Sequence, residues 1–189
     1  LKRCAVKVCG KLLTIKQLIL MKDYKSILKP DATYHIYNRA NGDDKLFVST
    51  SNYHYFLKQF KQYISPIAHI YCYCLMPNHF HFLLRIKSDD ELAINFQDIR
   101  NPSELLSNQF SNFFNSYTKA FNKQQGRKGN LFMHTFKRKR IIGDDYLTKL
   151  VHYIHFNPVK ANLCRTPEQW QFSSYKSILS NLPTQLQRG

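Results

Sequence analysis

Two β-strands joined by a tight turn are predicted by the stretch Tyr73-Cys74-Leu75-Met76-Pro77-Asn78-His79-Phe80-His81-Phe82-Leu83-Leu84-Arg85. Side chains alternate between the two faces of a strand, so both histidines leave one face while Phe80 leaves the other. Their Cα atoms would lie roughly 7 Å apart, close enough for both imidazoles to bind one metal ion. A half-buried strand that tolerates two histidines has the same pattern, so the triplet alone is a weak signal for metal binding.

The hydrophobic pattern around this hairpin predicts an α+β domain. Strands are expected at Thr33–Arg39, Ile67–Met76, His79–Ile86 and Phe136–Ile142, and helices at Thr50–Ile64, Ser103–Asn122 and Asp144–Phe156. Pro158 is expected to end the last helix, and 87–102 is expected to be a mobile polar loop. The order β-α-β-β-α-β, followed by a helix, predicts a ferredoxin-like split β-α-β antiparallel sheet. Helices would cover one face, and the other would be free for a ligand.

We expect one domain over residues 21–180, with a short tail at 181–189. The first twenty residues hold five basic side chains and no acidic one. They form a basic extension, and the sequence leaves open whether it belongs to the native domain. No apolar run is long enough to span a membrane, and no signal peptide is expected. The five cysteines include no CxxC pair, which indicates buried thiols in a reducing compartment.

The charge balance points to a polyanionic partner. The chain has 28 Lys and Arg against 12 Asp and Glu, a net charge of +16. Twelve Tyr and fourteen Phe accompany these charges and suit stacking on unpaired bases. No acidic residue occurs between Leu105 and Gly143, whereas eight basic residues do. We therefore expect a phosphate-binding surface there, and its candidate residues are Arg127, Lys128, Lys137, Arg138, Lys139 and Arg140. The last four alternate on a strand, so only about half can meet one DNA path.

The helix after Asp144 carries polar residues on one flank. At about 100° per residue, Tyr146, Lys149, Tyr153 and Asn157 fall together beside the apolar stripe. By themselves Tyr153 would be a boundary aromatic and Asn157 a helix C-cap. A metal that polarises a phosphodiester and a nucleophile that attacks it would use the histidine pair, the basic surface and this flank together.

Two long motifs resemble the single-tyrosine HUH transposases, with the REP-associated tyrosine transposases as the nearest branch. They are the run from Tyr73 to Leu84 and the run Tyr153-Ile-His-Phe-Asn-Pro-Val-Lys-Ala-Asn-Leu163. Shorter pieces match in order: Tyr34-His-Ile-Tyr-Asn-Arg39, Gly129-Asn-Leu-Phe132, Phe136-Lys-Arg138 and Trp170-Gln-Phe-Ser-Ser-Tyr175. The resemblance covers roughly residues 32–178.

The resemblance implies a nuclease and strand transferase acting on single-stranded DNA with hairpins. His79 and His81 match the metal-binding histidines, Tyr153 matches the nucleophile that forms a 5′-phosphotyrosine, and Asn157 matches the position expected to complete the metal shell. The expected ion is Mg or Mn rather than Zn. Arg39 and Lys149 join the basic candidates as DNA-binding residues. The resemblance further implies a cytoplasmic, nucleoid-associated prokaryotic protein that works as a monomer or homodimer.

Several alternatives stay open at this stage. The chain could be a non-catalytic module that binds single-stranded DNA or RNA, or a zinc protein that uses the histidine pair with Cys72 or Cys74. Tyr146 is a rival nucleophile on the same helix flank. His35 could approach the site or be structural, and His152 and His155 are expected at the surface or on phosphates.

Overall fold

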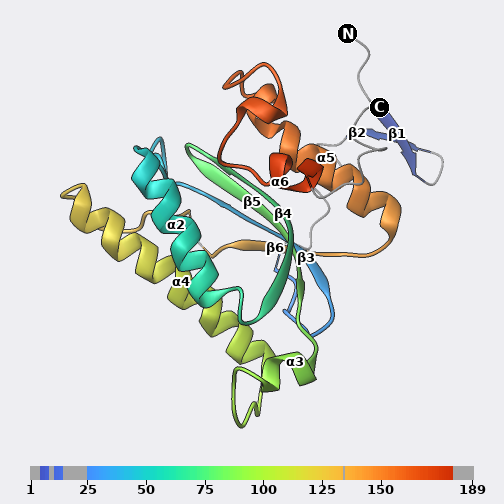
Figure 1. Ribbon diagram of the computed structural model, residues 1–189, viewed down its shortest axis with the longest axis vertical. Helices are drawn as coiled ribbons and strands as arrows, with labels where there is room; N and C mark the ends of the chain where they lie inside the picture. The colour runs from blue at the N-terminus through green and yellow to red at the C-terminus, as the bar shows by residue number, and fades with distance from the viewer. Residues whose placement is uncertain (1–4, 9–10, 15–24, 134, 181–189) are drawn as a thin grey trace.

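A four-stranded antiparallel sheet forms the centre of the protein. The computed structural model describes residues 5–8, 11–14, 25–133 and 135–180. The strands are β3 (Thr33–Arg39), β4 (Ala68–Met76), β5 (His79–Ile86) and β6 (Lys137–Ile141), in the order β4-β5-β3-β6 (Figure 1). All three strand pairs are antiparallel. This confirms the α+β class and puts the histidine pair on an interior strand.

Two helices cover one face of the sheet, α2 (Thr50–Tyr63) and α4 (Pro102–Gln124) (Figure 1). Both follow the predicted helices closely, because their aromatic residues recur at helical spacing and bury one stripe. Phe80 and Phe82 of β5 are fully buried against them. The ring of Phe60 stacks on that of Phe82 with a centroid distance of 4.0 Å. Each such ring pair adds about 0.5–1.5 kcal/mol beyond the burial of its area.

The second face of the sheet is covered in part by α5 (Asp144–Lys160). This helix packs on the β4 side, where Ile154 and Leu150 join Cys72, Cys74 and Met76 in a small apolar cluster. The expectation of a face entirely free for a ligand is therefore wrong for the β4 half. The β3–β6 half of the same face carries polar and charged side chains, and a cavity opens there.

The last turn of α5 departs from the expectation that Pro158 ends the helix. The helix continues through Pro158 to Lys160. Pro158 lacks an N–H and costs about 3 kcal/mol inside a helix, but it is buried, so packing offsets this cost. The backbone N–H of Ala161 still reaches the carbonyl of Asn157 at 3.0 Å. At the other end the N-cap is Gly143 with a φ of 87°, and Asp144 lies inside the first turn.

A C-terminal segment holds α5 against the sheet. It contains a 3-10 helix, η1 (Pro167–Gln169), and the short helix α6 (Tyr175–Ser180). Ser173 pairs with Cys74 at the open edge of β4. The indole N–H of Trp170 donates to the carbonyl of Leu75 at 2.9 Å, and the ring of Phe172 stacks on Tyr53 of α2 at 3.7 Å. The segment thus ties β4 to the helices on both faces.

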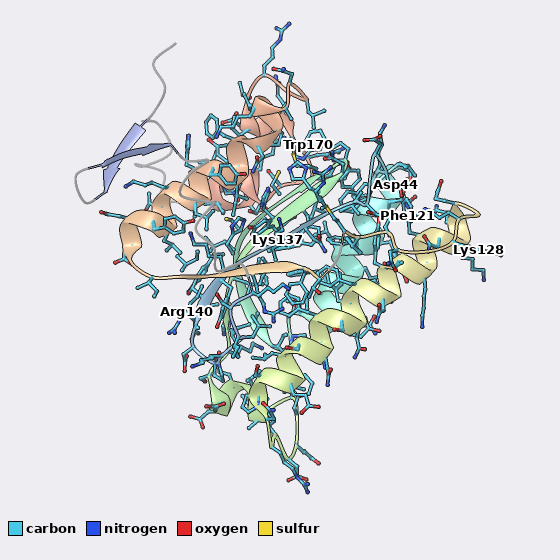
Figure 2. The ribbon with its side chains drawn as sticks, turned by 180° about the vertical axis from the view of Figure 1, so that it is seen from behind. Asp44, Phe121, Lys128, Lys137, Arg140 and Trp170 are labelled. Carbon is cyan, nitrogen blue, oxygen red and sulfur yellow. The ribbon has the colours of Figure 1, made fainter. Side chains whose placement is uncertain are left out.

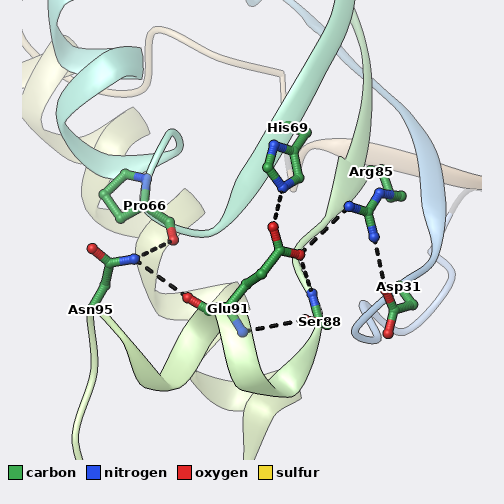
Figure 3. Close-up of polar contacts among 7 residues, drawn as sticks. All are labelled: Asp31, Pro66, His69, Arg85, Ser88, Glu91 and Asn95. Carbon is green, nitrogen blue, oxygen red and sulfur yellow. Dashed lines mark hydrogen bonds and ion pairs between the residues drawn. The ribbon is translucent and has the colours of Figure 1, made fainter.

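The expected mobile loop at 87–102 contains a capped helix, α3 (Asp89–Ala93). Ser88 and Glu91 form a reciprocal capping box: the Ser88 hydroxyl accepts from the Glu91 N–H at 3.2 Å, and the Glu91 carboxylate accepts from the Ser88 N–H at 3.0 Å (Figure 3). The same carboxylate bonds His69, and it lies 3.5 Å from the guanidinium of Arg85. The sequence contains the signal for this helix, since Ser-x-x-Glu is a helix-start signature.

The N-terminal extension holds a two-stranded antiparallel pairing, β1 (Ala5–Val8) with β2 (Lys11–Thr14). Met21, where we expect the domain to begin, and the predicted tail at 181–189 lie outside the described residues. Within the described part of the chain, no helix is both long and apolar enough to cross a membrane.

Candidate active site

A cavity of about 670 Å³ lies on the β3–β6 half of the second sheet face, beside α5. Its lining includes His79, His81 and Tyr153, together with Lys25, Tyr37, Asn38, Arg39, Asn78, Met133, Thr135 and Lys137. The structure therefore brings the predicted metal-binding pair and the predicted nucleophile to one place, although more than seventy residues separate them in the sequence. Within the part of the chain that the structure describes, the cavity lining contains three cationic side chains and no carboxylate.

The two histidines of β5 are each held by one ring nitrogen. Nδ1 of His81 lies 2.9 Å from Nε2 of His35 on the neighbouring strand, and both residues are buried. Nδ1 of His79 lies 2.7 Å from the side-chain oxygen of Asn78. Among the described residues no hydrogen bond engages Nε2 of either ring, and no fully buried polar atom lacks a partner. Both Nε2 atoms are therefore open to the cavity, the arrangement in which an outer partner orients a metal-binding histidine.

Burial keeps these imidazoles neutral. It lowers the pKa of His79 to about 4, with a further contribution from the charge of Arg39. It lowers the pKa of His35 to about 3 and that of His81 well below its usual value. A neutral imidazole has the free lone pair that a metal ion requires, so the rings do not have to lose protons before they bind one.

Tyr153 presents its ring to His81 from α5. The two ring centroids lie 5.5 Å apart at an interplanar angle of 74°. Burial raises the pKa of the Tyr153 hydroxyl, and the Asn157 amide offsets part of this rise. The ammonium of Lys160 lies 5.0 Å from the centroid of the Tyr153 ring. Lys160 was not predicted as a site residue, yet its spacing of seven residues from Tyr153 places both on one helix face.

Asn157 lies one turn beyond Tyr153. Its side-chain amide donates to the backbone carbonyl of Tyr153 at 3.1 Å, and its side chain is not part of the cavity lining. Among the residues described, no three His, Cys, Asp or Glu side chains form a group able to hold a metal. The histidine pair would therefore need oxygen ligands from an amide, from water or from a substrate.

The basic residues of β6 divide between the two sheet faces, as their alternation predicts. Lys137 and Lys139 pair in register with Tyr37 and His35, so they share the cavity face. Lys137 lines the cavity, and the Lys139 ammonium lies 3.3 Å from the hydroxyl of Tyr146.

Arg138 and Arg140 belong to the opposite face of β6. The Arg138 guanidinium donates to the carbonyl of Ser26 at 2.6 Å and lies over the ring of Phe136. It therefore contributes to the fold at this edge. Arg140 is exposed on the same strand, and Figure 2 shows it beside β6 with Lys137 further along.

Of the four remaining predicted DNA-binding residues, one lines the cavity and three do not. Arg39 lines the cavity. Arg127 forms an ion pair with Asp44 and a 3.0 Å hydrogen bond to Asn122, so it stabilises the loop after α4. Lys128 lies in that loop, away from Lys137 (Figure 2). Lys149 is exposed on α5 and does not line the cavity.

Sequence reasoning missed six residues of the cavity lining: Lys25, Tyr37, Asn38, Asn78, Met133 and Thr135. Tyr37 was within reach, because alternation along β3 puts His35, Tyr37 and Arg39 on one face. Lys25 had no local signal, since it reaches the site through an isolated parallel bridge to Arg138.

Four of the alternative site residues lie outside the cavity lining: Cys72, Cys74, His152 and His155. Cys72 and Cys74 are buried in the apolar cluster under α5, where burial raises the pKa of both thiols. His155, expected at the surface, is buried and lies 3.0 Å from the hydroxyl of Ser174. His152 is exposed and stacks on Phe156. These residues support the fold rather than the cavity.

Comparison with known proteins identifies the fold. The chain matches no family model and no curated protein. A solved structure of a REP-associated tyrosine transposase bound to a REP hairpin matches with a TM-score of 0.61 over 86% of this chain and 89% of that chain. The chain has the fold of a REP-associated tyrosine transposase. Sequence identity to this transposase is 18%, so the likeness is one of fold and confirms the predicted resemblance at that level.

Proposed function

We propose that the protein is a metal-dependent single-strand DNA endonuclease and strand transferase that uses Tyr153 as its nucleophile. The observation that carries this proposal is the cavity in which His79, His81 and Tyr153 meet. The transposase of the same fold was solved with a REP hairpin, which supports single-stranded DNA with hairpins as the substrate class.

The charges of the cavity suit a phosphate group. Lys25, Arg39 and Lys137 line it, and no other described residue of the lining has a carboxylate. Cations bind DNA phosphates in a salt-dependent and sequence-independent way. These side chains would hold the backbone of the strand and set its position relative to Tyr153.

The donor atoms of the site fit a divalent ion. His79 and His81 would hold it through Nε2, with Asn157 as the proposed third protein ligand; this would require its amide to turn from the Tyr153 carbonyl. When bound, Mg²⁺ or Mn²⁺ would supply Lewis-acid polarisation of the scissile phosphate. These hard ions suit the oxygen ligands that must complete such a shell, whereas imidazoles alone would suit zinc.

The proposed chemical step belongs to Tyr153. Its Oη attacks the phosphorus and forms a new P–O bond, the bond from phosphorus to the 3′ oxygen breaks, and a 5′-phosphotyrosine remains on the enzyme. The Oη proton is lost to solvent, and the leaving 3′ oxygen takes up a proton to become a 3′-OH. A 3′-OH from another strand can reverse the step, so strand transfer needs no ATP.

A hairpin oligonucleotide with single-stranded flanks, incubated with Mn²⁺ or Mg²⁺, tests the proposal. The native protein should give a shortened strand and a covalent protein–DNA band on a denaturing gel. Tyr153→Phe should give neither, while Tyr146→Phe, which changes the rival tyrosine of the same helix, should give both. A covalent band that persists in Tyr153→Phe would refute the assignment of the nucleophile.

The non-catalytic alternative predicts salt-sensitive DNA binding without cleavage under any metal. The zinc alternative has less support, because Cys72 and Cys74 pack under α5 with Met76. Metal analysis of the purified protein separates it from the main proposal, since a structural zinc site would retain its ion through dialysis.

A further inference from the structure

A second groove continues from the cavity, between α4 and the chain that leads into β6. Its volume is about 380 Å³. Asn38 and Thr135 line both the groove and the cavity. A DNA strand with a phosphate in the cavity would therefore have its neighbouring nucleotide beside the groove.

The two hollows differ in charge. Among the described residues, the cavity lining has three cationic side chains, whereas the groove lining has neutral amides and hydroxyls over phenyl rings and no charged side chain. Phosphates are bound by cations, but base edges are read by hydrogen-bonding side chains, and an Asn amide offers a donor and an acceptor side by side. The groove thus has the chemistry of a base site, and the cavity that of a phosphate site.

The groove has a floor of buried phenyl rings and exposed amide side chains at its wall. Phe114, Phe132 and Phe136 form the floor and are each less than a tenth exposed. Asn115 and Asn130 are exposed at its wall, and their side chains form no hydrogen bond within the described part of the chain. Asn122 on the same helix is different, because it donates to the carbonyl of Gly129 and accepts from Arg127.

We infer that this groove binds an unpaired nucleobase next to the scissile phosphate and reads its edge through Asn115 and Asn130. The inference rests on the proposed function, since it takes the cavity to hold that phosphate. It makes the groove the place where the enzyme distinguishes one base from another near the cleavage position. The segment from Leu105 to Gly143, which supplies most of the groove, has no acidic residue that would repel the strand.

Equilibrium binding of fluorescent hairpin oligonucleotides, in a Tyr153→Phe background that prevents cleavage, tests this inference. Each flanking nucleotide is replaced in turn by an abasic site and by the other three bases. One position should show a preference of roughly 5- to 150-fold, the range expected for a paired hydrogen-bond contact. Asn115→Ala should remove most of that preference and leave binding to the abasic oligonucleotide unchanged.

Asn112→Ala is the matched control, because Asn112 is exposed on the same helix and does not line the groove. It should keep the preference. Asn130→Ala should behave like Asn115→Ala. A base preference that survives both groove variants, or tight binding with no preference at any position, would overturn the base site and leave the proposed nuclease intact. Absence of any DNA binding would overturn both.

Discussion

The two ends of β5 present their side chains to the same sheet face in opposite electrostatic settings. At one end Arg85 lies 2.8 Å from the carboxylate of Asp31 and 3.5 Å from that of Glu91 (Figure 3). At the other end His79 and His81 face a cavity whose described lining has three cationic side chains and no carboxylate. One end of β5 thus has a cation paired with carboxylates of the fold, whereas the other end faces a cavity lined by cations and gathers positive charge.

The largest expected effect on cleavage comes from comparing an alanine substitution at each end of β5. His79→Ala removes a proposed metal ligand, so the initial rate of DNA cleavage should fall by about a hundredfold or more, beyond the usual loss from an outer partner. Arg85→Ala should leave this rate nearly unchanged and lower the melting temperature instead. Cleavage kinetics and thermal unfolding of both variants measure the two outcomes. Equal loss of cleavage in Arg85→Ala would show that the ends are not independent.

His35 tests whether the cavity end depends on a partner that orients its ligand. His35→Ala removes the group 2.9 Å from Nδ1 of His81, and outer partners of metal ligands typically contribute 10- to 100-fold in affinity. Calorimetric titration with Mn²⁺ should therefore show weaker binding by about this factor. His54→Ala, at an exposed position on α2, is the control and should bind as the native protein does. Unchanged affinity in His35→Ala would assign His35 to packing alone.

The two faces of β6 allow a similar comparison between a residue that lines the cavity and one that does not. Lys137 lines the cavity and Arg140 belongs to the other face. If Lys137 contacts a phosphate, Lys137→Ala should weaken DNA binding for all sequences and reduce the slope of log K against log salt by about 1. Arg140→Ala should leave the slope unchanged. Anisotropy titrations from low to moderate salt give both slopes, and equal slopes for the two variants would place the DNA path elsewhere.

The smallest expected effect is a dependence of stability on pH at the Arg85 end of β5. The backbone N–H of Ser88, together with His69, lowers the pKa of Glu91 from 4.5 to about 2. A lowered carboxyl pKa stabilises the fold above the ordinary value, and this contribution is lost as the pH falls from 4.5 towards 2. The melting temperature of the native protein should therefore exceed that of Glu91→Gln at neutral pH, and the two should converge near pH 2. A gap that stays constant down to pH 2 would contradict the role of the Glu91 charge.

The β4–β5 hairpin and the helices α2 and α4 could be predicted from the sequence because their signals are local. Alternation along β5 placed His79 and His81 on one face, and helical spacing placed Tyr153 and Asn157 on one flank. The motif resemblance then joined these two elements, and the structure brings His81 and Tyr153 together in one cavity. The chemical roles of these residues remain predictions.

The features that sequence reasoning missed depend on contacts between distant segments. The bond between His35 and His81 joins residues 46 positions apart. The groove brings α4 together with residues 130–132, 135 and 136. Pro158 stays helical because tertiary packing outweighs its local preference. None of these contacts leaves a periodic pattern within one element, so none could be read before the elements were assembled.

Peptide mapping of the covalent adduct tests whether Tyr153 is the nucleophile. The protein is incubated with Mn²⁺ and a hairpin oligonucleotide, then digested with protease and nuclease, and the modified peptide is identified by tandem mass spectrometry. We expect a 5′-linked nucleotide on Tyr153. Cleaved DNA without any adduct, or an adduct on Tyr146, would contradict it.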